Sequence, residues 1–163
     1  ALKQINIPGL RLVIIGVDNQ QEFLKGVDKS IRDRVLVLPK IPFSKLPEYL
    51  SVADIIAIPQ RRTSDSVGQI PARLFDAMAM AKPILATQIS DIPEVLGGCG
   101  YLVDPNEPSQ LADAIRYILN HPDEAHAKGQ AARERCQQMY DMHNLESGLH
   151  ELVEQIVSKK GFV

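Results

Sequence analysis

The chain has 163 residues, of which 45% are hydrophobic and 23% charged, and its 18 Lys and Arg against 20 Asp and Glu give a net charge of −2. This size predicts one domain whose core needs no disulfide or metal. The charge balance and the absence of Trp argue against a nucleic-acid-binding protein. No apolar run reaches the about 18 residues that span a membrane. Cys99 and Cys136 lack paired spacing and are expected to be reduced thiols of a cytoplasmic protein.

Five short apolar runs predict β-strands. They are nearly continuous rather than alternating, as is typical of strands buried on both faces of a parallel sheet. In chain order they are Arg11–Val17, Arg34–Leu38, Asp54–Pro59, Pro83–Thr87 and Gly100–Val103. The helices expected between them are Gln20–Asp33, Phe43–Ala53, Pro71–Ala81 and Pro93–Leu96. This alternation predicts an α/β fold, a Rossmann-like, doubly wound parallel sheet with helices on both faces.

The last third of the chain is predicted to be helical. One apolar stripe at helical spacing is formed by Leu111, Ile115, Ile118 and Leu119, and a second by Leu145, Leu149, Leu152, Val153, Ile156 and Val157. Both stripes are expected to pack against the core. Between them, the polar, Ala-rich segment Pro122–Met142 is predicted to lie on the surface. We find no internal repeat or Pro/Gly-rich linker, so residues 1–163 are expected to form a single domain.

Ligands of an open parallel sheet bind where the strands end, near helix N-termini that attract anions. Three segments fall there: Gly16, Pro39–Pro42 and the polar loop Gln60–Gln69. The loop leads into a predicted helix that carries Arg73 and Asp76 three residues apart on one face. This pair predicts either a surface salt bridge or a cation for a phosphate beside a carboxylate for ribose hydroxyls.

Several familiar sites are missing from the sequence. It contains no G-x-x-x-x-G-K-[ST] and no G-x-G-x-x-G after a strand, which argues against a P-loop ATPase and a dinucleotide-dependent dehydrogenase. Ser64 and Ser66 lie outside any G-x-S-x-G elbow. No acidic residue stands at zinc-site spacing from the histidines, so no metal site is expected. The histidines are His121, His126, His143 and His150.

Three segments carry a family resemblance. They read D-A-M-A-M-A-K-P-I-L-A-T from Asp76, I-P-E-V from Ile92 and G-Y-L-V-D-P from Gly100. Together they resemble the donor-binding half of retaining, nucleotide-sugar-dependent glycosyltransferases (glycosyl transferases group 1, family four type, with the two-domain B-type fold). The resemblance implies transfer of a sugar from a nucleotide-diphosphate sugar to an acceptor, with retention, in polysaccharide or glycolipid biosynthesis. It implies no metal and no cofactor besides the donor.

The resemblance also assigns roles to residues. Asp76 stands where the family has a glutamate that hydrogen-bonds the ribose, and Arg73 would face the diphosphate. Gly68 replaces the family's sugar-contacting glutamate. The cationic pair that neutralises the leaving diphosphate would precede Ala1, so no catalytic residue is assigned. The other residues expected to line the donor site are Gly16, Pro39, Lys40, Ile41, Ile70, Pro71 and Ala72.

At two positions this chain has another residue where the family has a glutamate, and this leaves other functions open. A non-catalytic nucleotide-binding or regulatory module of the same fold would tolerate Gly68 and Asp76 at these positions. A nucleotide-sugar epimerase of related fold is a third hypothesis, distinguished by product formation without an acceptor. Acceptor binding and any peripheral membrane association would depend on the N-terminal domain, which the resemblance places before Ala1.

The family's strand order makes one prediction about the sheet. Its first strand lies between the strands expected at Arg11–Val17 and Asp54–Pro59, and its sequence would precede Ala1. We therefore expect these two strands not to pair directly, because buried unpaired backbone groups each cost about 1–3 kcal/mol. A longer chain or a second chain in a homodimer is expected to supply the strand.

Overall fold

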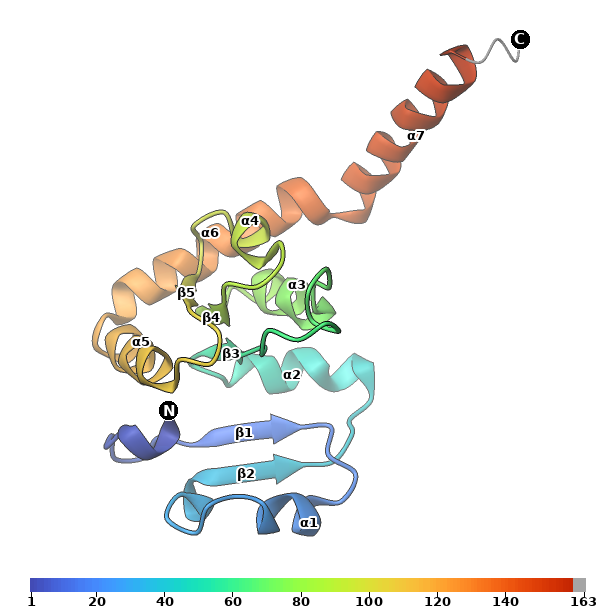
Figure 1. Ribbon diagram of the computed structural model, residues 1–163. Helices are drawn as coiled ribbons and strands as arrows, with labels where there is room; N and C mark the ends of the chain where they lie inside the picture. The colour runs from blue at the N-terminus through green and yellow to red at the C-terminus, as the bar shows by residue number, and fades with distance from the viewer. Residues whose placement is uncertain (160–163) are drawn as a thin grey trace.

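The structure is a computed structural model that describes residues 1–159, without the side chains of His143, Leu145, Ser147 and Lys159. Two residues considered above, His143 and Leu145, therefore have side chains outside the described part. The chain forms two parallel β-sheets, a set of helices around them and a C-terminal helix that projects from the rest (Figure 1). The described helices include none long and apolar enough to cross a membrane.

All five predicted strands are present with shorter bounds. The first sheet pairs β1 (Leu12–Ile15) with β2 (Val35–Leu38). The second has the order β3-β4-β5, formed by β3 (Ile56–Ile58), β4 (Ile84–Thr87) and β5 (Tyr101–Val103). Every ladder in the described part is parallel.

β1 and β3 belong to different sheets, so the prediction that these two strands do not pair directly is confirmed. The expectation that every strand is buried on both faces is wrong for the first sheet. Val13 of β1 is 48% exposed and Leu36 of β2 is 50% exposed, whereas all four residues of β4 are buried. In the second sheet Ala57 of β3 is exposed as well, whereas residues of β4 pack on both faces.

The helix predicted over Gln20–Asp33 is wrong beyond its first turns. The observed α1 (Gln20–Lys25) stops at Gly26, and a loop follows in which Asp28 accepts hydrogen bonds from the N–H and hydroxyl of Ser30, at 2.9 and 2.8 Å. Such a local side-chain turn competes with helix. The remaining elements of this part are the 3₁₀ turns η2 (Arg32–Arg34) and η3 (Phe43–Lys45) and the helix α2 (Leu46–Ser51).

The second sheet has helices on both faces, as predicted. Ile84 and Ala86 of β4 pack with α3 (Ala72–Ala79) and α4 (Ile92–Leu96), whereas Leu85 packs with Ile118 of α5 (Pro108–Asn120). Successive strand residues point to opposite faces, so α5 lies on the face opposite α3 and α4. The apolar stripe predicted for α5 is confirmed.

The two last helices differ from expectation. α6 (Pro122–Tyr140) does not lie only on the surface, because its small residues Ala125, Gly129 and Ala132 are buried and it packs along α3. α7 (Met142–Lys159) was expected to pack through its apolar stripe. Its apolar side chains are exposed instead, Leu149 to 62% and Leu152 to 52%. Figure 1 shows this helix extending away from the sheets.

The N-terminal turn η1 (Leu2–Gln4) connects the two sheets. Arg34, which precedes β2, donates to the carbonyls of Leu2 and Ile5, at 3.3 and 2.9 Å. Arg116 of α5 donates to the carbonyl of Gln4 from the other side. Two arginines thus hold η1 between the first sheet and α5.

Candidate functional site

The segments predicted to bind a ligand lie on one side of the molecule. Figure 1 shows the loops after β1 and β2 and the loop that leads into α3 on the same side, where the strands end. We call the last of these, residues 60–70, the α3 loop. The predicted arrangement of three segments at the carboxyl edge is therefore present.

Gly16 joins the first two segments. Its N–H donates to the carbonyls of Leu38 and Pro39, at 3.1 and 3.3 Å, and the N–H of Val17 donates to Leu38 at 3.2 Å. The φ angle of Gly16 is +98°, a conformation that side chains rarely adopt, and a Cβ there would meet no atom within 4 Å. The backbone at this edge is therefore open on the side where glycine lacks a side chain.

The residues after β2 lie beside this glycine. Pro39 and Lys40 are exposed and Ile41 is half-buried. Lys40 Nζ lies 2.9 Å from Asp18 Oδ2 in an exposed ion pair. Sequence reasoning missed Asp18 as the partner of Lys40, because the two residues are brought together only by the pairing of β1 with β2.

The α3 loop is folded on itself around Ser66. The Ser66 hydroxyl accepts from the N–H of Thr63 at 2.9 Å and donates to the carbonyl of Arg61. Gly68 has a φ of +86°, and its N–H donates to Ser90 Oγ at 3.2 Å. The loop that carries the replaced family glutamate is thus fixed against the turn before α4.

Helix α3 begins directly after this loop. Pro71 was predicted in its first turn and is instead the residue just before it, with Ala72 as the first helical residue and Ile70 packed against the core. Arg73 is exposed in the first turn, where its charge opposes the helix dipole. Among residues 1–159 neither the Arg73 guanidinium nor the Asp76 carboxylate makes a hydrogen bond or an ion pair, so the predicted surface salt bridge between them does not form.

Asp76 is half-buried, and burial raises the pKa of its carboxyl above the ordinary value. The carboxylate has lost part of its hydration and gains no hydrogen bond from the described residues in return. A desolvated, unpaired carboxylate near the start of a helix is a typical feature of a binding site.

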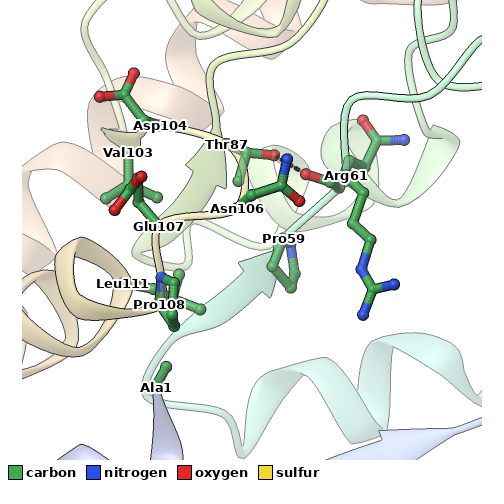
Figure 2. Close-up of a pocket in the computed structure, with 11 residues that line it drawn as sticks. Ala1, Pro59, Arg61, Thr87, Val103, Asp104, Asn106, Glu107, Pro108 and Leu111 are labelled. Atoms are coloured by element: carbon green, nitrogen blue, oxygen red, sulfur yellow. Dashed lines mark hydrogen bonds between the residues drawn. The ribbon is translucent and has the colours of Figure 1, made fainter.

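A separate pocket of about 460 Å³ lies at the ends of β3, β4 and β5 (Figure 2). Gln60 and Arg61, the start of the polar loop predicted from the sequence, line it, whereas none of the residues assigned to the donor site does. The Thr87 hydroxyl donates to the Gln60 carbonyl at 2.9 Å, and Gln60 Oε1 is buried without a partner in the described part. The position of Thr87 and Asp104 directly at strand ends was the signal that sequence reasoning did not use.

Asp104 is engaged within the fold. Its carboxylate accepts from Gln110 at 3.0 Å and from Gln88 at 2.6 Å, and these two bonds lower the pKa of the carboxyl. In the described residues no three His, Cys, Asp or Glu side chains are grouped so that they could hold a metal ion. Both cysteines are free thiols.

The family described as Glycosyl transferases group 1 matches residues 1–121. The chain belongs to this family. Among curated relatives, it is 34% identical over 104 residues to alpha-maltose-1-phosphate synthase of Mycolicibacterium smegmatis, a match covering 59% of this chain and 26% of the relative. It is 29% identical over 134 residues to D-inositol 3-phosphate glycosyltransferase of Pseudarthrobacter chlorophenolicus, covering 78% of this chain and 31% of the relative. The chain thus spans about a third or less of these two proteins.

Solved structures confirm the fold expected for a group 1 chain. Sucrose-phosphate synthase of Thermosynechococcus elongatus matches with a TM-score of 0.79 and 24% identity, over 94% of this chain and 40% of that one. Anabaena HepE, crystallised in complex with UDP, matches with a TM-score of 0.78 and 18% identity, over 91% of this chain and 42% of that one.

Proposed function

We propose that this group 1 chain is the nucleotide-sugar-binding domain of a cytoplasmic glycosyltransferase. The whole enzyme would move a sugar from a nucleoside-diphosphate sugar to an acceptor with retention of the anomeric configuration. The observation that carries the proposal is Asp76, a half-buried carboxylate without a partner in the described part of the chain, one turn from an equally unpaired Arg73. The names of the relatives and the UDP complex of HepE support the substrate class.

The two side chains suit the two polar parts of a nucleotide. The Asp76 carboxylate would accept hydrogen bonds from the ribose hydroxyls, which offsets its desolvation. Arg73 would pair with the diphosphate, and the anion would relieve the unfavourable placement of a cation in the first turn of α3. Cationic side chains and helix dipoles can stabilise a leaving diphosphate without a metal, so the proposal includes no cofactor besides the donor.

The nucleoside would extend from this pair toward the ends of β1 and β2. There Gly16 leaves the backbone open, and Pro39 and Ile41 offer apolar surface beside backbone groups. Lys40 is held by Asp18, so its charge is already compensated. We therefore propose contact with the base through the backbone and apolar atoms of this segment.

The sugar end is where the chain departs from its family. Gly68 offers only backbone groups, so any sugar contact in the α3 loop would come from the main chain or from neighbouring side chains. This absence of a side chain favours one alternative, a non-catalytic nucleotide-binding or regulatory module. The acceptor, and any contact with a membrane, would be bound by a part of the enzyme outside this chain.

Activity of the full-length protein tests the proposal. UDP-, GDP- and ADP-sugars would be incubated with and without sugar and lipid-linked acceptors, with nucleoside diphosphate release, donor isomers and anomeric configuration measured. Acceptor-dependent release with retention supports the proposal. Nucleotide binding without turnover of any donor supports the non-catalytic module, and isomerisation of the donor without acceptor supports an epimerase. Failure to bind any of the three nucleoside diphosphates contradicts all of these.

A further inference from the structure

We infer that the Asp91 carboxylate binds the sugar part of the donor by accepting hydrogen bonds from its hydroxyls. The inference rests on the proposed function, and it names a side chain for the end of the donor that Arg73 and Asp76 do not contact. A carboxylate accepts hydrogen bonds and repels other anions, so the substrate class that it implies is a nucleotide carrying a neutral sugar.

The connection between β4 and α4 lies against the α3 loop at Gly68. The Gly68 N–H donates to Ser90 Oγ at 3.2 Å, and Ser90 directly precedes Asp91. Ser90 has a φ of +53°, a conformation that persists for a residue with a side chain only where its surroundings hold it. On the other side of Asp91, Ile92 is completely buried. The backbone of Asp91 is therefore fixed beside Gly68.

Space for a ligand exists at Gly68. This glycine is exposed, and a Cβ at its position would meet no atom within 4 Å. The side of Gly68 that a side chain would occupy is thus open, and a sugar can approach the backbone there. The nearest part of the β4–α4 connection along this surface is the segment that contains Ser90 and Asp91.

Asp91 is left without a partner in a connection whose other polar side chains are engaged. The preceding polar side chains, which all make hydrogen bonds within the fold, are those of Thr87, Gln88 and Ser90. The Asp91 carboxylate is exposed and makes no hydrogen bond or ion pair with any residue from 1 to 159. It is therefore free to accept hydrogen bonds from a ligand.

The Asp91 side chain also does not make the bond that Asp normally makes at the start of a helix. Asp91 is the N-cap residue of α4, a position that Asp favours because its carboxylate accepts a backbone N–H of the first turn. Asn19 makes such a bond at the start of α1, where its Oδ1 accepts from the N–H of Glu22 at 3.0 Å. The Asp91 carboxylate makes no capping bond. A role in stabilising α4 therefore does not account for this carboxylate.

The position of Asp91 matches the order of groups in the donor. In the proposed function Asp76 holds the ribose and Arg73 the diphosphate, and the sugar follows the diphosphate. The α3 loop precedes Arg73, and Gly68 lies in this loop, so a sugar beyond the diphosphate would lie against Gly68 and next to Asp91. Hydrogen bonds from its hydroxyls to a carboxylate are charge-assisted and stronger than those to a neutral acceptor.

Titration calorimetry of the full-length protein tests the inference. The ligands are UDP, GDP and ADP and the derivatives of each with glucose, galactose, mannose and N-acetylglucosamine. We expect Asp91→Asn and Asp91→Ala to bind the nucleotide sugar about 10-fold or more weakly and the nucleoside diphosphate within about 2-fold of the unmodified protein, because only the former carries the sugar. Both variants should keep the melting temperature of the unmodified protein, since the carboxylate caps no helix.

A matched control is Asp123→Asn. Asp123 is an exposed carboxylate in the first turn of α6, and the preceding Pro122 lies with Asp54 and Pro83 around a cavity at the opposite ends of β3 and β4. Asp123→Asn should therefore bind both kinds of ligand as the unmodified protein does.

Four results would overturn the inference. Unchanged affinity of both Asp91 variants for the nucleotide sugar would show that the carboxylate does not contact it, and an equal loss for the nucleoside diphosphate would show that the effect does not depend on the sugar. A lower melting temperature and weaker binding in Asp91→Ala alone would assign Asp91 to capping α4, because Asn also caps helices. Binding of a nucleoside diphosphate but of none of its sugar derivatives would overturn this inference and leave the nucleotide site standing, whereas failure to bind any of the three nucleoside diphosphates would contradict the proposed function as well.

Discussion

The N–H of Gly68 and the hydroxyl of Ser90 meet at 3.2 Å across 22 residues of sequence. Both residues have positive φ angles, +86° and +53°, so two unusual backbone conformations are joined by one hydrogen bond. The bond ties the α3 loop, which precedes Arg73 and Asp76, to the turn that starts α4. The geometry of the proposed donor site therefore depends in part on a hydroxyl outside it.

Removing this hydroxyl should loosen the loop. We predict that Ser90→Ala weakens nucleoside diphosphate binding by about 2- to 10-fold, because a net hydrogen bond contributes about 0.5–1.5 kcal/mol. Calorimetric titration of the full-length protein measures the change. Ser109→Ala, at an exposed serine of α5, is the control and should bind as the unmodified protein does. Equal affinity of both variants would show that the loop does not need this bond.

Restoring the family's acidic residue should not simply restore a sugar contact. Gly68→Glu places a side chain at a φ of +86°, where a non-glycine residue costs about 1–2 kcal/mol, although a Cβ there meets no atom within 4 Å. We predict a lower melting temperature for Gly68→Glu and a smaller loss for Gly68→Asn, since Asn tolerates this region. An unchanged melting temperature together with tighter donor binding would contradict this account and favour a direct sugar contact.

The close contact between α6 and the turn after α3 predicts that one Gly→Ala substitution within a helix destabilises the protein. A Cβ at Gly129 would lie 2.3 Å from the Ala81 carbonyl oxygen, whereas a Cβ at Gly148 of α7 would meet nothing within 4 Å. Gly→Ala in an exposed helix normally stabilises by about 1 kcal/mol. We predict that Gly148→Ala leaves stability equal or higher and that Gly129→Ala destabilises the protein by about 1–3 kcal/mol. Chemical denaturation of both variants measures the difference. A neutral Gly129→Ala would mean that the helices do not pack as closely as described.

These contacts also indicate how far the sequence alone could lead. Continuous apolar runs identified all five strands, although Val13 of β1 and Leu36 of β2 are more exposed than this pattern predicts. The end of α1 before Gly26 was missed. It depends on the turn in which Asp28 accepts two hydrogen bonds from Ser30, and the sequence pattern does not reveal that these bonds form. α6 looked like a surface helix because its buried residues are Ala and Gly, which give little hydrophobic signal.

The candidate site was predictable to a similar extent. The adjacency of Gly16 and Pro39 followed from the rule that neighbouring parallel strands end at one edge. The ion pair of Lys40 with Asp18 depends on the register of two strands, which the sequence does not encode locally. The lack of a partner for the Asp76 carboxylate among the described residues could not be predicted either. It depends on which side chains the fold places around Asp76, and not on the spacing of charged residues along the sequence.

Donor binding should depend on pH through Asp76. Burial raises the pKa of its carboxyl in the folded protein above the ordinary value. At a pH above this raised pKa the half-buried carboxylate is ionised and lowers the free energy of unfolding, and this loss is relieved as the pH falls through the raised pKa. The ribose requires the ionised acceptor. We therefore predict that affinity falls on acidification, beginning at a higher pH than for an ordinary Asp, and that Asp76→Asn binds weakly with no such dependence. Titrations across the acidic range test this, and an equally pH-dependent Asp76→Asn would assign the effect to another group.

We propose that the Asp76 carboxylate binds the ribose of a nucleotide donor. Isothermal titration of the full-length protein with UDP, GDP and ADP should identify one ligand whose affinity falls about 10-fold or more in Asp76→Ala, since hydrogen bonds to a charged group contribute about 1.5–3 kcal/mol. Asp76→Glu should retain most of the affinity. Asp54→Asn, an exposed carboxylate at the opposite end of β3, should bind as the unmodified protein does. Undiminished binding by Asp76→Ala would contradict the claim.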